Sequence, residues 1–364
     1  MSSVPLRVHV LYESSAGGSP HGCSEIRLLR PLAHPTIQHD IALTYGLKLP
    51  DELVDIIIVE RLWNQACDHG IQMASFRHAR ENGVRVAFEI DDDLLGVNNE
   101  ACFRAGITIS QQMWVRRMVR MSDGVIVSTP NLATRLGRLS SNIDVIPNAL
   151  DENLFRPSEK FNPRMAEDGS IVFGYMGTFT HLDDLLSILN PIRTVLAKYK
   201  DRVRFEIVGV GNSVALNSLF FGLPVRLLQV PNEAVPYPDF VRWFQKNIKW
   251  DFGIAPLVDS EFTRSKSDIK YLDYGVQSIP GIFSNVPAYQ ETIRHGLNGL
   301  LAKNKNEWEQ SLSSIIDDPN LRLKLAKEAH RQVWEERMLR TEAKIWAGVI
   351  RRIFVAHPTI HEAR

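Results

Sequence analysis

Short apolar segments alternate with amphipathic segments along almost the whole chain. In its first part the apolar segments lie at residues 7–12, 55–60, 85–90, 124–128 and 144–146. They show little alternation of polar and apolar positions, which is typical of strands covered by helices on both faces. The helical patterns between them lie at 72–82, 115–121 and 131–139. Strands and helices in this order predict an α/β fold with parallel sheets.

The alternation stops at residues 147–160 (PNALDENLFRPSEK), which carry two prolines and no helical period. We expect this stretch to link two domains, since 364 residues exceed the usual size of one. The boundaries predicted from it are an N-terminal Rossmann-like domain at 1–150, a second one at 151–335 and a C-terminal helical segment at 336–364.

The pattern of apolar strands then restarts in the second part of the chain. Helices are expected at 306–316 and 320–328, and a long final helix at about 332–354, with Trp346, Ile350 and Phe354 on one apolar stripe. A helix at 182–199 should be kinked or divided by Pro191. The predicted strands of this part lie at 170–175, 203–208, 225–230, 252–257 and 279–283.

The composition is that of an ordinary globular protein and narrows the function only slightly. The 42 basic side chains equal the 42 acidic ones, so net charge steers the protein toward neither nucleic acid nor an anionic membrane. The three cysteines have no CxxC spacing, which argues against a disulfide framework or a zinc site and fits a reducing cytoplasm. The early first strand leaves no room for a signal peptide, and no run reaches the ~18 apolar residues of a membrane span.

The most informative stretch is 251–299, in which an apolar strand opens into a loop rich in Lys, Ser and Asp. The carboxyl end of a strand is where open α/β sheets bind ligands. Lys266 and Ser267 lie in this loop just before a helix, where a cation and free amides can bind phosphate. Lys270 follows one helical turn later and is the alternative cation, and a solvated loop lysine is the simpler interpretation of Lys266.

Several ordered motifs in this half of the chain resemble one enzyme family. The strings FGYMGTFTHLDDL, DFGIAPLVDSEF and KSDIKYLDYGVQSIPGIFSNVPAYQETIRHGLNG are similar to the donor-binding half of family-four glycosyltransferases of the GT-B fold, and DVIPNALDENLFRP resembles the usual interdomain junction of that family. The bacterial branch that assembles polysaccharide, O-antigen or rhamnan is the most similar. EIDDDLL and SDGVIVSTPNLA in the first half resemble the family more loosely.

The resemblance implies two Rossmann-like domains facing across a cleft, with the final helix crossing back to the first domain. The implied reaction moves a sugar, with retention of configuration, from a UDP-, GDP- or dTDP-linked donor to an acceptor hydroxyl. The acceptor would be a saccharide, a lipid-linked molecule or a small molecule. No cofactor and no metal are expected, because the fold stabilises the leaving diphosphate with cationic side chains and helix ends.

The resemblance also assigns roles to individual residues of the donor domain. Asp273 stands at the second acid of the paired-acid motif, which accepts hydrogen bonds from the ribose hydroxyls, as an acceptor-only carboxylate can. Ser265 stands eight positions earlier, where the family has the acid that contacts the transferred sugar. Further donor-site positions implied by the motifs are Val235 and Tyr237 at the nucleobase, Asn285 and Val286 near the diphosphate or sugar, and Glu291 in the acid-and-glycine segment that follows.

The loop after the strand at 170–175 contains Gly177, Thr178 and His181. Most members of the family have Arg and Lys in this loop, and here Thr178 and His181 take their places. The backbone amides of Gly177 and Thr178 are candidate phosphate donors, and His181 is a candidate catalytic donor that can titrate near neutrality. A structural role of His181 at the start of the following helix is an equally good interpretation.

Three stretches of the first half remain open to more than one interpretation. Asp91 and Asp92, followed by Asp93, end a strand and are candidates to orient the acceptor hydroxyl or to act as its base; a Mg²⁺ or Mn²⁺ site and a simple turn cap are the alternatives. Gly17 and Gly18 lie in a turn that lets a ligand approach the backbone, or are merely flexible. Trp114 with Arg116, Arg117 and Arg120 either contacts a membrane surface peripherally or forms a solvated helix face.

Two rival functions follow from the departures from the family pattern. One is another enzyme of the same fold, an epimerase or a phosphorylase, although no pyridoxal lysine motif is evident. The other is a degenerate sugar-nucleotide-binding partner of another transferase, which the missing acid at Ser265 keeps open.

Overall fold

The chain forms two compact units, each built on one parallel sheet. The computed structural model describes residues 4–15, 18–63, 69–96, 107–164, 169–209 and 213–355. Unit 1 comprises Met1–Asp151, Ser265–Ser267 and Leu339–Arg364, and unit 2 comprises Glu152–Arg264 and Asp268–Met338. Three residues from the middle of the sequence of unit 2 therefore belong to unit 1.

The sheet of unit 1 has six parallel strands in the order β2-β1-β3-β4-β5-β6. Every residue of β3 is buried, as the unbroken apolar run predicts. The sequence analysis missed β2, an edge strand whose residues are mostly half-buried or exposed and so give no clear pattern. The strands are β1 Leu6–Leu11, β2 Ile41–Gly46, β3 Ile56–Glu60, β4 Arg85–Ile90, β5 Gly124–Val127 and β6 Ile143–Val145.

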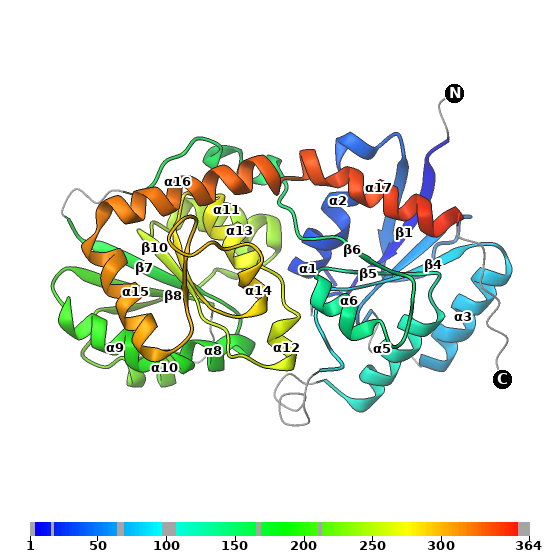
Figure 1. The fold of residues 1–364 in the computed structure, drawn as a ribbon. Helices are drawn as coiled ribbons and strands as arrows, with labels where there is room; N and C mark the ends of the chain where they lie inside the picture. Colours follow the sequence, from blue (N-terminus) through cyan, green and yellow to red (C-terminus); the bar gives the residue numbers. More distant parts are fainter. Residues whose placement is uncertain are drawn as a thin grey trace. The chain divides into compact units, whose positions relative to one another are not determined.

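Helices cover both faces of this sheet, and each face has its own apolar core. One core contains Trp346 and Ile350 of α17, which lies alongside α2 (Figure 1). The other contains Phe76 of α3 and Met118 of α5. The helices are α1 Gly22–Ser24, η1 Glu25–Leu29, α2 Arg30–Leu32, η2 Pro35–Ile37, α3 His69–Glu81, α5 Ile109–Met121, α6 Pro130–Leu136 and α17 Leu339–Val355.

The sheet of unit 2 also has six parallel strands, in the order β12-β11-β10-β7-β8-β9. Two glycines allow large side chains to pack directly on it: a Cβ at Gly174 would lie 1.8 Å from Trp250, and one at Gly253 would lie 2.6 Å from Tyr274. The strands are β7 Ile171–Met176, β8 Val203–Val208, β9 Val225–Leu228, β10 Phe252–Ala255, β11 Gly281–Ser284 and β12 Leu300–Ala302.

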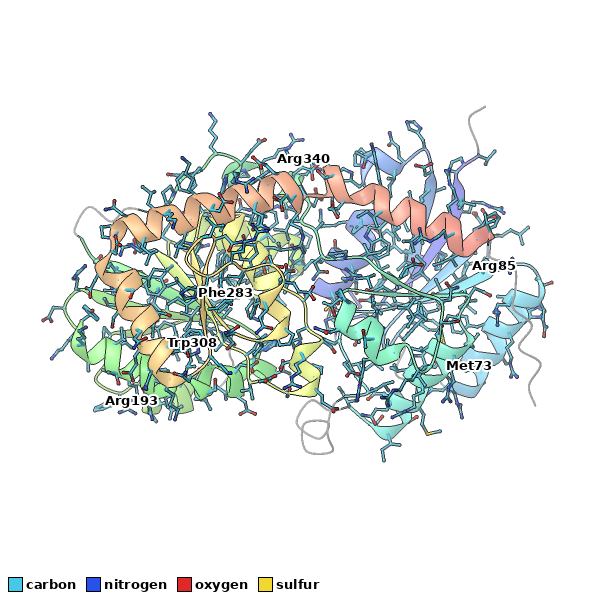
Figure 2. All side chains as sticks on the ribbon, viewed as in Figure 1. Met73, Arg85, Arg193, Phe283, Trp308 and Arg340 are labelled. Atoms are coloured by element: carbon cyan, nitrogen blue, oxygen red, sulfur yellow. The ribbon has the colours of Figure 1, made fainter. Side chains whose placement is uncertain are left out.

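The core of unit 2 buries aromatic side chains from both strands and helices. Phe283 of β11 and Trp308 of α15 are almost fully buried, whereas Arg193 of α9 is exposed (Figure 2). The main helices are α8 Leu182–Ser187, α9 Leu189–Lys198, α10 Ser213–Leu219, α11 Tyr237–Asn247, α13 Ile269–Gly275, α15 Lys305–Asp317 and α16 Pro319–Glu336. Shorter helical turns are α7 Glu152–Phe155, η3 Arg156–Ser158, η4 Phe179–His181, η5 Asn232–Ala234, α12 Glu261–Arg264 and α14 Pro287–Gln290.

Two helix predictions are informative in their outcome. The helix expected at 182–199 is divided at Ile188, and Pro191 lies in the first turn of α9, where a missing amide leaves no hydrogen bond unmade. The single long helix expected at 332–354 is wrong, since α16 ends at Glu336 and α17 begins at Leu339. Arg337, the C-cap of α16, forms a two-pronged ion pair with Asp268 at 2.7 and 3.0 Å, which holds the chain where the helix ends.

The aromatic residue of the basic stretch on α5 does not face solvent. Trp114 is 1% exposed and donates from Nε1 to the carbonyl oxygen of Arg61 at 2.9 Å, so it is no membrane anchor and that part of the interpretation is wrong. Arg116, Arg117 and Arg120 are exposed, as a solvated helix face requires, and their contact with a membrane stays a prediction. In the described part of the chain, no helix combines the length and apolar character needed to span a membrane.

Candidate functional site

The strand orders define one preferred ligand position in each unit. In an open parallel sheet, ligands bind at the carboxyl ends of the strands where the chain reverses its direction of growth across the sheet. In unit 1 this position lies between β1 and β3, because β2 is on one side of β1 and β3 to β6 are on the other. In unit 2 it lies between β7 and β10.

At the position in unit 2, one buried carboxylate connects the loops after the two strands. Oδ2 of Asp184 lies 2.8 Å from Nδ1 of His181, in the loop after β7. Its Oδ1 accepts a hydrogen bond of 2.8 Å from the backbone amide of Val258, after β10. Asp184 is 7% exposed, so this contact orients the imidazole of His181 in a partly dry site. Both interpretations of His181 thus remain open, and Asp184 is a site residue that the sequence analysis missed.

The glycine loop after β7 uses part of its backbone for the fold itself. The amide of Gly177 donates to the carbonyl oxygen of Val208 at 3.1 Å, so it is not a phosphate donor, and that part of the prediction is wrong. The hydroxyl of Thr178 lies 2.8 Å from that of Thr180 and is exposed. The N-cap of α8 is His181, which makes no side-chain cap bond to the helix.

Helix α13 carries the predicted ribose acid, Asp273. This side chain is half-buried and makes no hydrogen bond or ion pair with the described residues. Burial raises its pKa from 3.8 to about 7, against the opposing effect of the nearby Lys270 ammonium. An acid that is poised near neutrality and has no hydrogen-bond partner among the described residues is a good candidate to receive ligand hydroxyls.

A network of polar side chains holds α13 in place. Asp268, at its N-cap, binds Arg337 and accepts from Thr292 Oγ1 at 2.6 Å. Asn298 donates to Tyr271 Oη at 3.0 Å and to Gln332 Oε1 at 2.6 Å. These bonds connect α13 to α16 and to the loop before β12, so the position of Asp273 is set by the packing of three elements.

The remaining predicted donor residues lie in the loops of unit 2. Val235 is 63% exposed between η5 and α11, while Tyr237 at the start of α11 is buried, so only Val235 presents its side chain to solvent. Asn285 follows β11 and accepts from Gln290 Nε2 at 2.9 Å. Val286 is buried, and Glu291 is exposed after α14.

At the position in unit 1, an arginine bridges the ends of three neighbouring strands. Arg61 follows β3 and donates from Nε to Glu13 Oε2, after β1, at 2.8 Å. It donates from Nη1 to Asp91 Oδ1, after β4, at 3.0 Å. Its backbone adopts a positive φ of 28°, which costs a non-glycine residue about 1–3 kcal/mol. Arg61 and Glu13 are further site residues that no sequence motif indicated.

Each of the three consecutive aspartates has its own cationic partner. Asp91 pairs with Arg61, and Asp92 accepts from Lys266 Nζ at 3.0 Å. Asp93 is buried, pairs with Arg135 at 3.0 Å and accepts from the amides of the following turn, which is the turn-cap interpretation. These three cations offset the repulsion that three consecutive carboxylates would otherwise exert on one another.

The segment 265–267 brings predicted donor residues into unit 1. Ser265 is buried, and its carbonyl oxygen accepts from Thr129 Oγ1 at 2.8 Å. Ser267 Oγ accepts from Asn148 Nδ2 at 2.8 Å. Together with the bond between Lys266 and Asp92, all three residues are held by side chains of unit 1. The two candidate groups Lys266 and Asp92, proposed separately from the sequence, are therefore hydrogen-bond partners.

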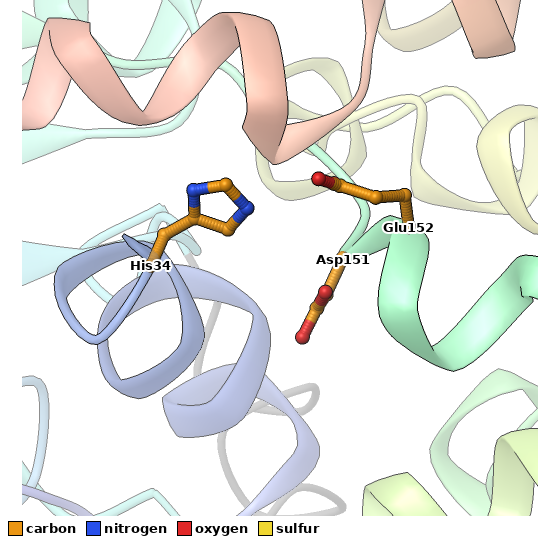
Figure 3. A group of neighbouring side chains, drawn as sticks. All are labelled: His34, Asp151 and Glu152. Carbon is orange, nitrogen blue, oxygen red and sulfur yellow. The ribbon is translucent and has the colours of Figure 1, made fainter. Parts of the chain in front are cut away.

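The glycine turn after β1 is only partly described. Gly18 is exposed, has a φ of 79° and accepts from Tyr12 Oη at 3.1 Å, and Gly17 lies outside the described residues. Figure 3 shows His34 and Asp151 of unit 1 together with Glu152, which follows Asp151 in the sequence and is the first residue of unit 2. Within unit 1, Asp151 pairs with Arg30 at 2.7 Å, and His34 Nδ1 lies 2.7 Å from Thr36 Oγ1.

Near the carboxyl ends of β3 and β4, two glutamates of these adjacent strands are fully buried side by side. Glu60 of β3 and Glu89 of β4 are register partners. Glu89 Oε1 accepts from Arg27 Nε at 2.7 Å, whereas Glu60 Oε2 accepts only neutral donors, the amide of Glu13 at 2.7 Å and Ser24 Oγ at 2.6 Å. Burial raises the pKa of Glu60 from 4.5 to about 8 and that of Glu89 from 4.5 to about 7.

No protein-family model matches the sequence, and a search of curated proteins finds no match either. Solved structures do match over nearly the whole chain. HepE of Anabaena, in complex with UDP-glucose, is 12% identical, with a TM-score of 0.64 over 95% of this chain and 99% of that chain. A glycosyltransferase of Rickettsia africae is 13% identical, with a TM-score of 0.63 over 97% and 100%.

A third match, sucrose-phosphate synthase of Thermosynechococcus elongatus, is 16% identical, with a TM-score of 0.60 over 84% of this chain and 75% of that chain. With identities this low, the three likenesses establish the fold alone. The chain has the two-domain α/β architecture of the GT-B fold, which confirms the fold predicted from the strand and helix pattern.

Proposed function

We propose that this protein is a glycosyltransferase that moves a sugar from a nucleotide-sugar donor to an acceptor hydroxyl in glycan or glycoconjugate synthesis. The observation that carries the proposal is the ligand position of unit 2, where Asp184 connects His181 after β7 to the amide of Val258 after β10. An oriented imidazole at the reversal point of a parallel sheet suits a diphosphate ligand. The GT-B fold of the chain agrees with this chemistry.

In the proposed mechanism, the leaving nucleoside diphosphate gains charge as the glycosidic bond breaks. His181, and an ammonium from Lys266 or Lys270, would stabilise that charge more in the transition state than in the ground state. We propose retention of configuration without a covalent carboxylate, with the donor phosphate taking the acceptor proton. Asp91 or Asp92 would orient the acceptor hydroxyl by accepting its hydrogen bond.

A UDP-linked sugar is the first donor to test, and GDP- and dTDP-linked sugars are the alternatives. HepE was crystallised with UDP-glucose, and the structurally similar TarM of S. aureus was crystallised with UDP. A saccharide hydroxyl is the acceptor class that we propose.

The test is nucleotide release from a panel of UDP-, GDP- and dTDP-sugars, measured with water alone and with added saccharides. We expect release from one nucleotide class and little effect of a chelator, because cationic side chains carry the role that a metal would have. Activity that EDTA abolishes and Mn²⁺ restores would contradict metal independence and revive the metal interpretation of Asp91 and Asp92.

A degenerate binding partner is the second candidate, favoured by the serine in place of the first motif acid. Ser265 is buried, and its backbone carbonyl accepts from Thr129, so this residue helps to hold the fold and need not contact a ligand. The same panel separates the two candidates. Tight nucleotide-sugar binding without release, even with cell extract supplying acceptors, would favour the partner.

Asp273→Asn should weaken the binding of UDP-glucose by about tenfold or more, the range for losing hydrogen bonds to a charged group. The carboxylate form accepts ribose hydroxyls best, and the pKa of Asp273 is about 7. Wild-type affinity should therefore rise between about pH 6 and pH 8, where the diphosphate of UDP-glucose keeps its charge. The Asn variant should show no such rise in calorimetry.

The matched control for Asp273 is Asp201→Asn, which removes an exposed carboxylate elsewhere in unit 2. It should bind like the wild type at every pH. An Asp273→Asn variant with wild-type affinity at about pH 8 would remove Asp273 from the ribose site.

A further inference from the structure

At the ligand position of unit 1, one oxygen of Asp91 is fixed and the other is left for a ligand. Arg61 Nη1 holds Oδ1 at 3.0 Å, and Ser128 Oγ holds the backbone carbonyl of the same residue at 3.0 Å. Oδ2 makes no hydrogen bond or ion pair with the described residues, and the side chain keeps 17% of its surface exposed. Asp91 therefore presents one acceptor atom in one direction.

Both the backbone and the guanidinium of Arg61 are held by hydrogen bonds. Its backbone amide donates to Glu89 O at 2.9 Å, and its carbonyl oxygen accepts from Trp114 Nε1 at 2.9 Å. Its guanidinium is shared between Glu13 and Asp91, and Nη1 also lies 3.9 Å from Asp92 Oδ2. The strained φ of 28° persists because these bonds determine the backbone on both sides.

We propose that Arg61 is the positioning residue of the acceptor site: it holds Asp91 so that Oδ2 accepts the hydrogen bond of the incoming hydroxyl. This role rests on the proposed glycosyl transfer. The planar guanidinium suits it because it spans two carboxylates from different strand ends at once, which the single ammonium of a lysine cannot do with fixed geometry. Arg61 touches no reacting atom and acts through Asp91.

The variant that tests this role is Arg61→Gly, since glycine adopts a positive φ without strain and loses only the side chain. Turnover of a UDP-sugar should fall by about 100-fold, the scale expected for misplacing a reacting group. The loss should lie in kcat, while UDP affinity, a property of unit 2, stays unchanged. The kcat of Arg61→Lys should lie between those of the wild type and Arg61→Gly, because lysine keeps the positive charge but lacks the planar group that reaches two carboxylates at once.

Chemical rescue separates positioning from a merely structural role. Guanidinium ion added to Arg61→Gly should restore part of the lost kcat, because it can occupy the space between Glu13 and Asp91. Urea, a neutral molecule of the same shape, should restore nothing at the same concentration. The control variant is Arg80→Ala, which removes the guanidinium bound to Asp123, just before β5 at the amino-terminal ends of the strands, and should keep near-normal kcat.

The outcomes distinguish this role from the proposed function. A wild-type protein that releases no nucleotide from any donor would overturn the proposed function and the role of Arg61 with it. An active wild type with an equally active, folded Arg61→Gly would overturn the role alone. A loss of kcat that guanidinium and urea rescue equally, or that neither rescues while thermal unfolding shows a collapsed unit 1, would assign Arg61 to the fold.

Discussion

Lys266→Ala is expected to lower the turnover of a nucleotide sugar by about 100-fold or more, by analogy with the loss of one preorganised donor to a developing anion. The leaving diphosphate gains charge only as the bond to the sugar breaks. The loss should therefore appear in kcat and much less in the KM for the donor. Steady-state nucleotide release measures it, with Lys327→Ala, an exposed lysine of α16, as the matched control.

The hydrogen bond between Lys266 and Asp92 offers a different explanation that a double-mutant cycle resolves. If Lys266 serves only to hold Asp92, then Asp92→Asn and the double variant should be as slow as Lys266→Ala. If Lys266 stabilises the leaving group, removing it should slow the Asp92→Asn enzyme by a further ~100-fold. Unchanged kcat in Lys266→Ala would exclude both roles.

The strands and helices of this fold were largely predictable, because strands buried on both faces appear in the sequence as unbroken apolar runs. β3 and β4 coincide almost fully with the apolar runs predicted at 55–60 and 85–90. β2 was not predictable in this way, because an edge strand needs no continuous apolar run. The break between α16 and α17 left no local signal either, as the pairing of Arg337 with Asp268 joins residues far apart in the sequence.

Some residues of the candidate site could also be predicted from the sequence, and others could not. Residues within motifs, such as Asp273, His181 and Asp91, could be proposed from the sequence, and His181 and Asp91 follow the carboxyl ends of strands, where a parallel sheet binds ligands. Arg61, Glu13 and Asp184 could not, because each is a single charged residue whose meaning depends on which strand ends are neighbours. Strand order is set by tertiary packing, so such residues become visible only in the folded chain.

Glu60→Gln should stabilise the protein above about pH 8 and have little effect near pH 5. In the folded state Glu60 keeps its proton up to about pH 8, while in the unfolded chain it releases it near 4.5. Between these values the native state binds more protons, so the free energy of unfolding falls as pH rises. Each pKa unit corresponds to about 1.4 kcal/mol, so the neutral glutamine should gain about 2–5 kcal/mol at alkaline pH.

Glu89→Gln provides the contrast between the two glutamates. Glu89 accepts from the buried guanidinium of Arg27 at 2.7 Å, and its pKa rises only to about 7, because this cation opposes the effect of burial. The smaller rise predicts a smaller gain for Glu89→Gln than for Glu60→Gln at about pH 8.5, and the weakened bond to Arg27 should lower the stability of Glu89→Gln at about pH 5, where the wild-type acid is already protonated. Thermal unfolding at about pH 5 and pH 8.5 measures both variants, with the exposed Glu52→Gln as control. Equal pH dependence in the Glu60→Gln variant and the wild type would show that Glu60 is ionised throughout, and that another donor must then compensate its buried charge.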